Sequence, residues 1–207
     1  MSDTTYPQRS SIGDTPQNPA GTRGRRPLDA VPESAFLQPE DLAGAEPRAV
    51  TDEFGRHLRP PLPCGPRRYP SLLLRQAEGT VLIDFPVAEF HTTLLEHVMT
   101  FRGATAAAYL RDLRVSVGRQ SGCTDETGRW TVEEVGTTEP RSLLIRLRQE
   151  FEDPSGQPAG KDSYLYVART GRVVVVVADL GWEMGSGRLD TVRGLAAAAL
   201  RRAGTVR

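Results

Sequence analysis

The chain has 207 residues, which is enough for one domain of ordinary size with additional tails. Its 26 lysines and arginines balance 26 aspartates and glutamates, so it lacks the excess positive charge that is typical of nucleic-acid-binding proteins. With 25% charged and 38% hydrophobic residues, the composition excludes a fibrous or fully disordered chain. We expect a folded protein with no nucleic-acid partner.

The sequence carries no membrane-spanning or secretory pattern. Residues 1–30 contain no apolar run of the kind found in signal peptides, and the longest continuous apolar stretch, residues 173–178, is too short to cross a bilayer. The sequence as written therefore predicts a cytoplasmic protein without membrane insertion. A signal peptide or lipobox upstream of this sequence would instead make the protein extracytoplasmic.

Proline marks the first third of the chain, because 12 of the 16 prolines fall in residues 1–70. Residues 1–33 are rich in proline, arginine and serine and too poor in large apolar side chains to offset the entropy of ordering, so we predict a disordered tail there. Residues 34–43, SAFLQPEDLA, predict a short helical turn that docks on the domain. The prolines in residues 59–66 predict an extended path.

Beyond residue 70 the periodicity of strands becomes visible. Residues 71–76 and 80–85 predict two short strands separated by a polar turn at 77–79, and further strands are predicted at 130–136 and 142–151. The side chains of residues 92–101 are expected to point alternately to the two faces of a further strand. One predicted face holds Leu95, His97, Met99 and Phe101, and the other holds Leu94, Glu96, Val98 and Thr100.

Residues 163–170 and 172–179 predict the clearest hairpin, with a turn at Thr170 and Gly171 after a loop at 153–162. A two-residue turn places Tyr164 and Tyr166 on the same face as Val173, Val175 and Val177. It places Leu165 and Val167 on the other face with Val174 and Val176. Because both faces are apolar, we expect this hairpin to lie in the middle of a sheet that is covered on both sides.

Two segments have the spacing of amphipathic helices. Residues 104–117 carry Ala106, Leu110, Leu113 and Val117 on one stripe, and the segment after Gly187 carries Leu189, Val192, Ala196, Ala199 and Ala203, with Ser186 as the predicted N-cap. We therefore predict one α+β domain over residues 34–205. Its sheet is twisted, mostly antiparallel and built of five to seven strands, and it packs with two main helices.

The sequence contains no motif of a metal, cofactor or nucleotide site, and we predict no metal, no cofactor and no catalytic residues. Cys64 and Cys123 do not have the spacing of zinc ligands, which leaves one disulfide or two free thiols as alternatives. His97 lies among apolar residues of its strand, where a lone histidine is more often a hydrogen-bonded core residue than a catalytic base.

Four local patterns are similar to those of one family. They are FLQPEDL at 36–42, PCG at 63–65, FRGATAAAYLRDLR at 101–114 and RTGRVVVVVADLGW at 169–182. In their order along the chain they resemble the actinobacterial sensor-like domain that lies outside the membrane in PknH-type serine/threonine kinases and in related lipoproteins. The resemblance covers most of residues 36–203.

The resemblance implies an α+β fold, a disulfide between Cys64 and Cys123 and a cleft between sheet and helices that binds a small extracytoplasmic ligand. We therefore predict a non-catalytic sensor-like or ligand-binding module. The aromatic residues expected to line its cleft are His97, Tyr109, Tyr164, Tyr166 and Trp182. The partner is then an unidentified small molecule or protein.

Two other functions remain open from the sequence. One is a small-molecule enzyme that uses His97 or a carboxylate such as Glu150 as a base in the same cavity. The other is a regulatory protein that binds a partner through the tail and an open sheet edge.

Overall fold

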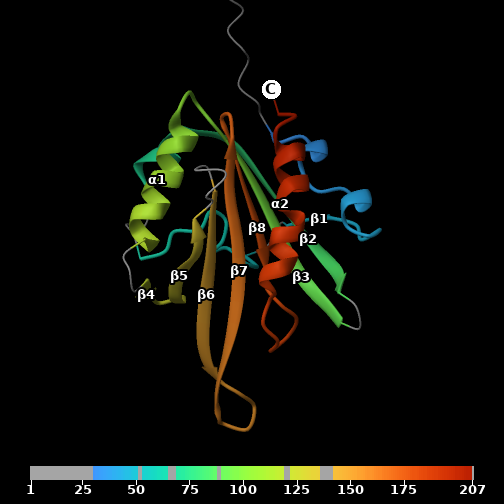
Figure 1. Ribbon diagram of the computed structural model, residues 1–207, viewed down its shortest axis with the longest axis vertical. Helices are drawn as coiled ribbons and strands as arrows, with labels where there is room; N and C mark the ends of the chain where they lie inside the picture. The colour runs from blue at the N-terminus through green and yellow to red at the C-terminus, as the bar shows by residue number, and fades with distance from the viewer. Residues whose placement is uncertain are drawn as a thin grey trace, which may run out of the picture.

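An eight-stranded antiparallel sheet forms the centre of the computed structural model, in the order β1-β2-β3-β8-β7-β6-β5-β4 (Figure 1). The structure describes residues 30–50, 53–64, 69–87, 90–118, 122–135 and 142–206. The predicted α+β class with an antiparallel sheet is confirmed, but the expected five to seven strands were too few. The edge strands β1 (Arg48–Ala49) and β4 (Cys123–Asp125) are too short to produce a periodic pattern.

The other six strands form three antiparallel pairs along the chain. Their bounds are Arg75–Val87 for β2, Phe90–Phe101 for β3, Gly128–Val135 for β5, Ser142–Glu152 for β6, Pro158–Thr170 for β7 and Val173–Asp179 for β8. Three short 3₁₀ helices precede β2: η1 (Glu33–Ala35), η2 (Pro39–Asp41) and η3 (Pro70–Leu74).

The region around residues 71–79 differs from the prediction. Most of the expected strand at 71–76 is the 3₁₀ helix η3, which begins at Pro70, a residue well suited to the first helical position. The expected turn at 77–79 lies inside the continuous strand β2, where Gly79 pairs with Val98 of β3. The polar residues fit a strand here because β3 supplies a hydrogen-bonding partner along its whole length.

The alternation in the central strands divides the interior into two apolar clusters. Leu95, Met99 and Phe101 of β3 pack on one face together with the helix α1 (Thr105–Val117). Leu94 and Val98 pack on the opposite face together with α2 (Leu189–Ala203). Each face of the sheet therefore has its own helix, and the five valines at 173–177 are buried between them.

The predicted hairpin of β7 and β8 and the division of its residues between the two faces are confirmed, but the turn lies one residue later than predicted. Thr170 pairs with Val173 and Tyr166 pairs with Val177, so the turn consists of Gly171 and Arg172. Gly171 has a positive φ of 56°, a conformation that glycine adopts without steric cost. The two tyrosines of β7 accordingly lie on the α2 face of the sheet.

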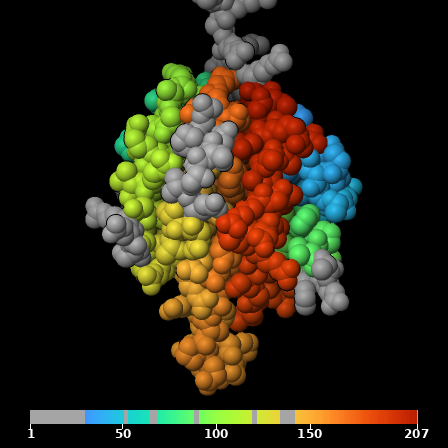
Figure 2. Space-filling model, viewed as in Figure 1, coloured from blue at the N-terminus to red at the C-terminus, as the bar shows by residue number. Residues whose placement is uncertain are grey.

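The segment that leads into α2 differs from the prediction. Arg188 is the N-cap and makes no side-chain capping bond, whereas the Ser186 hydroxyl accepts a hydrogen bond from the Asp162 amide at 3.0 Å. Ser186 is therefore used to attach the loop to β7. The predicted loop at 153–162 is shorter than expected, because β7 already begins at Pro158 and pairs there with Glu152. The resulting ribbon of β6 and β7 projects from the body of the molecule (Figure 2).

The predicted docking of the segment around residues 34–43 is confirmed. Phe36, Leu37 and Leu42 are buried on the α2 face, and Arg202 of α2 forms ion pairs with Glu40 and Asp41. Residues 1–29 of the predicted tail lie outside the described residues, and within residues 30–33 the helix η1 starts at Glu33. None of the described helices is long and apolar enough to cross a membrane.

Candidate functional site

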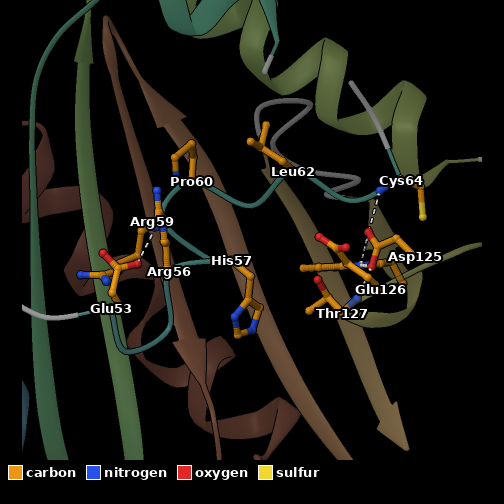
Figure 3. Close-up of a pocket in the computed structure, with 11 residues that line it drawn as sticks. Glu53, Arg56, His57, Arg59, Pro60, Leu62, Cys64, Asp125, Glu126 and Thr127 are labelled. Atoms are coloured by element: carbon orange, nitrogen blue, oxygen red, sulfur yellow. Dashed lines mark hydrogen bonds and ion pairs between the residues drawn. The ribbon is translucent and has the colours of Figure 1, made fainter. Parts of the chain in front are cut away.

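A pocket of about 860 Å³ lies between residues 53–64, which we call the strap, and the hairpin of β4 and β5 (Figure 3). The strap supplies one wall and the hairpin residues around the β4–β5 turn supply the other. The lining residues are Glu53, Arg56, His57, Arg59, Pro60, Leu62, Cys64, Asp125, Glu126, Thr127 and Trp130. The volume is within the range of small-ligand sites in proteins.

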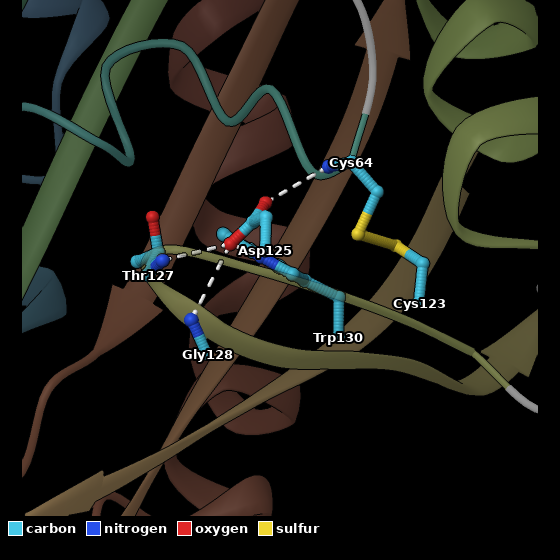
Figure 4. Close-up of a disulfide and its surroundings, with 6 residues drawn as sticks. All are labelled: Cys64, Cys123, Asp125, Thr127, Gly128 and Trp130. Atoms are coloured by element: carbon cyan, nitrogen blue, oxygen red, sulfur yellow. Dashed lines mark hydrogen bonds between the residues drawn. A yellow bond between two sulfur atoms is a disulfide. The ribbon is translucent and has the colours of Figure 1, made fainter.

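A disulfide joins the two walls. Cys64 at the end of the strap is bonded to Cys123 at the start of β4, with a Cα–Cα distance of 6.0 Å (Figure 4). The pairing implied by the family resemblance is thus present. The bond closes a loop of 59 residues in sequence and keeps the strap beside the hairpin.

The Asp125 carboxylate provides a second connection between the walls. It accepts hydrogen bonds from the Cys64 amide at 2.9 Å and from the Thr127 amide at 2.9 Å, as well as from the Gly128 amide and the Trp130 indole (Figure 4). Burial alone raises the pKa of Asp125, but these donors outweigh it and leave the pKa below its usual value. The carboxylate is therefore ionised, and its hydrogen bonds link the strap to the hairpin.

Apolar and aromatic contacts attach the strap to the sheet. Leu58 is fully buried in the cluster on the α1 face. The Tyr109 hydroxyl of α1 donates a hydrogen bond to the Pro61 carbonyl at 3.0 Å, and the Tyr109 ring stacks on Phe101 with 5.9 Å between centroids. The strap is thus held in place by its contacts with α1 and by the disulfide at its end.

The two walls carry different charges. The strap wall contains Arg56 and Arg59, and Arg56 forms an exposed ion pair with Glu53 at 2.7 Å. The hairpin wall contains Asp125 and Glu126. Between them lies the ring of His57, an exposed residue (Figure 3), whose pKa is lowered below its usual value by partial desolvation and by Arg59, against the opposing effect of Asp125. His57 is therefore neutral at pH 7 and offers one donor and one acceptor.

His97, a predicted ligand residue, is buried in β3 and is not among the residues that line the pocket. Its Nδ1 is hydrogen-bonded to the Thr80 hydroxyl at 2.8 Å. Burial, together with the positive charges of Arg75 and Arg59, lowers its pKa to about 3. It is a neutral core residue in this structure.

The four predicted aromatic residues are distributed over different parts of the molecule. Tyr109 is buried under the strap on the α1 face, and Tyr164 and Tyr166 pack on the α2 face. Trp182, 48% exposed, follows β8 and lies 6.4 Å from the His91 ring, beside a smaller pocket of about 290 Å³. The structure does not bring the five predicted residues together in one cavity.

Sequence reasoning did not identify His57, Arg59, Asp125 or Glu126 as site residues. His57 and Arg59 lie in an irregular segment, and Asp125 and Glu126 lie at the end of the three-residue strand β4 and in the turn after it, where no hydrophobic periodicity marks which side chains point inward. The pairing of Cys64 with Cys123 was the available signal, because a disulfide requires the residues that flank each cysteine to lie close together.

No family model matches this sequence, and no curated protein matches it. Among solved structures, the chain is similar to the crystal structure of the extracellular domain of PknH from Mycobacterium tuberculosis. The two share 15% sequence identity and a TM-score of 0.49, with 87% of this chain and 98% of that chain covered.

Proposed function

We propose that this protein is an extracytoplasmic, non-catalytic module that binds a small ligand in the pocket between the strap and the β4–β5 hairpin. The observation that carries the proposal is the disulfide-fastened pocket itself: two segments that are far apart in sequence are joined by Cys64 and Cys123, with a cavity of about 860 Å³ between them. Because the disulfide already restrains the two walls, they lose little conformational entropy when a ligand binds, and this favours binding.

The disulfide also supports the extracytoplasmic location. Disulfides persist in oxidising compartments, whereas thiols are kept reduced in the cytosol. Both cysteines of the chain are used in this one bond. We accordingly prefer the extracytoplasmic alternative to the cytoplasmic location that the sequence as written predicts.

Binding is favoured over catalysis by the state of the titratable groups. Asp125 accepts four hydrogen-bond donors and has a lowered pKa, so it is a weak proton acceptor. The two bases considered for an enzyme do not share a cavity with it: His97 is buried in the core, and Glu150 lines a separate pocket with Arg129, Arg146 and Arg148.

The proposal is tested by a small-molecule screen on the full chain with its disulfide intact. Binding is measured by thermal shift and by ligand-observed NMR against a library of common metabolites. Thr127→Trp fills the pocket while retaining the backbone amide that binds Asp125, so hits should be lost in this variant. Val115→Trp is the matched control, because Val115 is 66% exposed on α1 and lines none of the pockets described above. Hits that survive Thr127→Trp would place binding elsewhere.

A second candidate function, protein binding, is favoured by the projecting ribbon. β5 pairs with β6 only as far as Arg148, and β8 pairs with β7 only as far as Tyr164, so the ribbon beyond them has no described strand on either side. Open strand edges are common sites of strand addition. A partner that co-purifies with the full chain, and is lost when the ribbon is shortened but retained in Thr127→Trp, would support this function over ligand binding.

A further inference from the structure

We propose that the pocket between the strap and the hairpin takes a small zwitterion with its opposite charges at its two ends, a short peptide, with its amine at Glu126 and its carboxylate at Arg56. This inference rests on the proposed ligand-binding function and adds the chemical class of the ligand. It follows from the distribution of charge across the pocket.

The hairpin wall supplies the site for a positive group. Glu126 lines the pocket, is exposed, and makes no hydrogen bond or ion pair with any residue that the structure describes. Its neighbour Asp125 is already satisfied by backbone and indole donors. Glu126 is therefore the carboxylate of this wall that can attract the ammonium group of a ligand.

The strap wall supplies the site for a negative group. Arg56 and Arg59 both line the pocket, and a guanidinium binds a carboxylate through paired hydrogen bonds. The Arg56–Glu53 pair is exposed, with 77% and 79% of the two side chains accessible. Such an exposed pair contributes little to stability, so Arg56 can exchange Glu53 for a ligand carboxylate.

The middle of the pocket carries no net charge. Neutral His57 lies between the two walls, and Pro60, Leu62 and Trp130 provide apolar surface. A ligand with a single charge would gain a charge-assisted contact at only one of the two walls. A molecule with opposite charges at its two ends matches both walls, and about 860 Å³ is enough for a dipeptide.

The test uses the full, oxidised chain with a set of dipeptides, each compared with its N-acetylated and C-amidated forms by calorimetry. The zwitterion should bind at least about tenfold more tightly than either blocked form, which corresponds to one charge-assisted contact. Glu126→Gln should weaken binding of the zwitterion by about tenfold and leave the N-acetylated form unchanged. Glu152→Gln, an exposed carboxylate on the projecting ribbon, should change neither affinity.

Three outcomes would overturn the inference. They are equal binding of the blocked forms, an unchanged affinity in Glu126→Gln, and no binding of any dipeptide. If a neutral or singly charged metabolite binds instead and is excluded by Thr127→Trp, the proposed function stands and the zwitterion is wrong. If no compound in either panel binds, both fail.

Discussion

The amide of Cys64 donates a hydrogen bond to the carboxylate of Asp125, so the residue that forms the disulfide with Cys123 is also held by the side chain two positions beyond Cys123. The covalent bond and the hydrogen bond fasten the strap to the same hairpin. The pocket between them is therefore maintained by a covalent bond that is sensitive to reduction and by a weaker hydrogen bond that is sensitive to acid.

Removing the disulfide should destabilise the fold. For a closed loop of 59 residues, the chain-entropy model gives a loss of about 4 kcal/mol in the free energy of unfolding. Urea denaturation of the oxidised chain and of the Cys64→Ser/Cys123→Ser variant measures the difference. An unchanged denaturation midpoint would show that the bond does not constrain the unfolded chain.

Asp125→Asn should loosen the strap while the disulfide remains intact. The amide has one acceptor oxygen in place of two and no charge, and loss of charge-assisted hydrogen bonds costs about 1–3 kcal/mol. Hydrogen exchange should accelerate at the amides of Cys64 and Thr127. Because the folded pKa of Asp125 is lowered, its stabilisation should be present above its usual pKa of 3.8 and be lost on acidification. A variant with wild-type exchange rates would contradict this role.

Glu96→Gln should stabilise the protein at neutral and alkaline pH. Glu96 is fully buried in β3, where burial raises its pKa to about 8 despite a hydrogen bond from the Leu37 amide at 2.7 Å. The folded state then binds one more proton than the unfolded state between the usual pKa of 4.5 and about 8. The unfolding free energy should fall by about 1.4 kcal/mol per pH unit across that range.

Denaturation curves of the wild type and Glu96→Gln at several pH values test this slope. Glutamine keeps an oxygen that accepts the Leu37 amide but does not titrate, so the difference between the two proteins should grow from pH 4.5 to pH 8 and then become constant. Glu78→Gln, a partly exposed carboxylate of β2, is a control. A difference that does not depend on pH would mean that Glu96 is ionised in the folded state.

His97→Gln should change the pH dependence of stability below pH 6.5. Because the folded pKa of His97 is lowered from 6.5 to about 3, the unfolded state binds the additional proton between these values. Stability in the wild type should therefore decrease on acidification from pH 6.5 towards pH 3, by about 1.4 kcal/mol per unit from this residue. The variant should lose that component, and NMR titration of the His97 ring should show no protonation above pH 5.

Local patterns in the sequence determined the two faces of β3, the two faces of the β7–β8 hairpin, both main helices and the docking of Phe36, Leu37 and Leu42. These features were predictable because alternation and helical spacing are properties of neighbouring residues. The buried Glu96 was placed on the correct face, but its burial under Leu37 requires a contact across 59 residues of sequence. The pairing of the two cysteines came from resemblance to a family.

Tertiary structure decided the continuity of β2, the short edge strands and the position of the pocket. The expected turn at 77–79 became strand because β3 pairs with it, and β4 exists because β5 lies beside it. The pocket residue His57 comes from an irregular segment and Asp125 from the end of the short strand β4, and a disulfide and a hydrogen bond over a long sequence separation bring these two segments together. Such contacts leave no periodic trace in the chain, since each depends on where the rest of the fold places its partner.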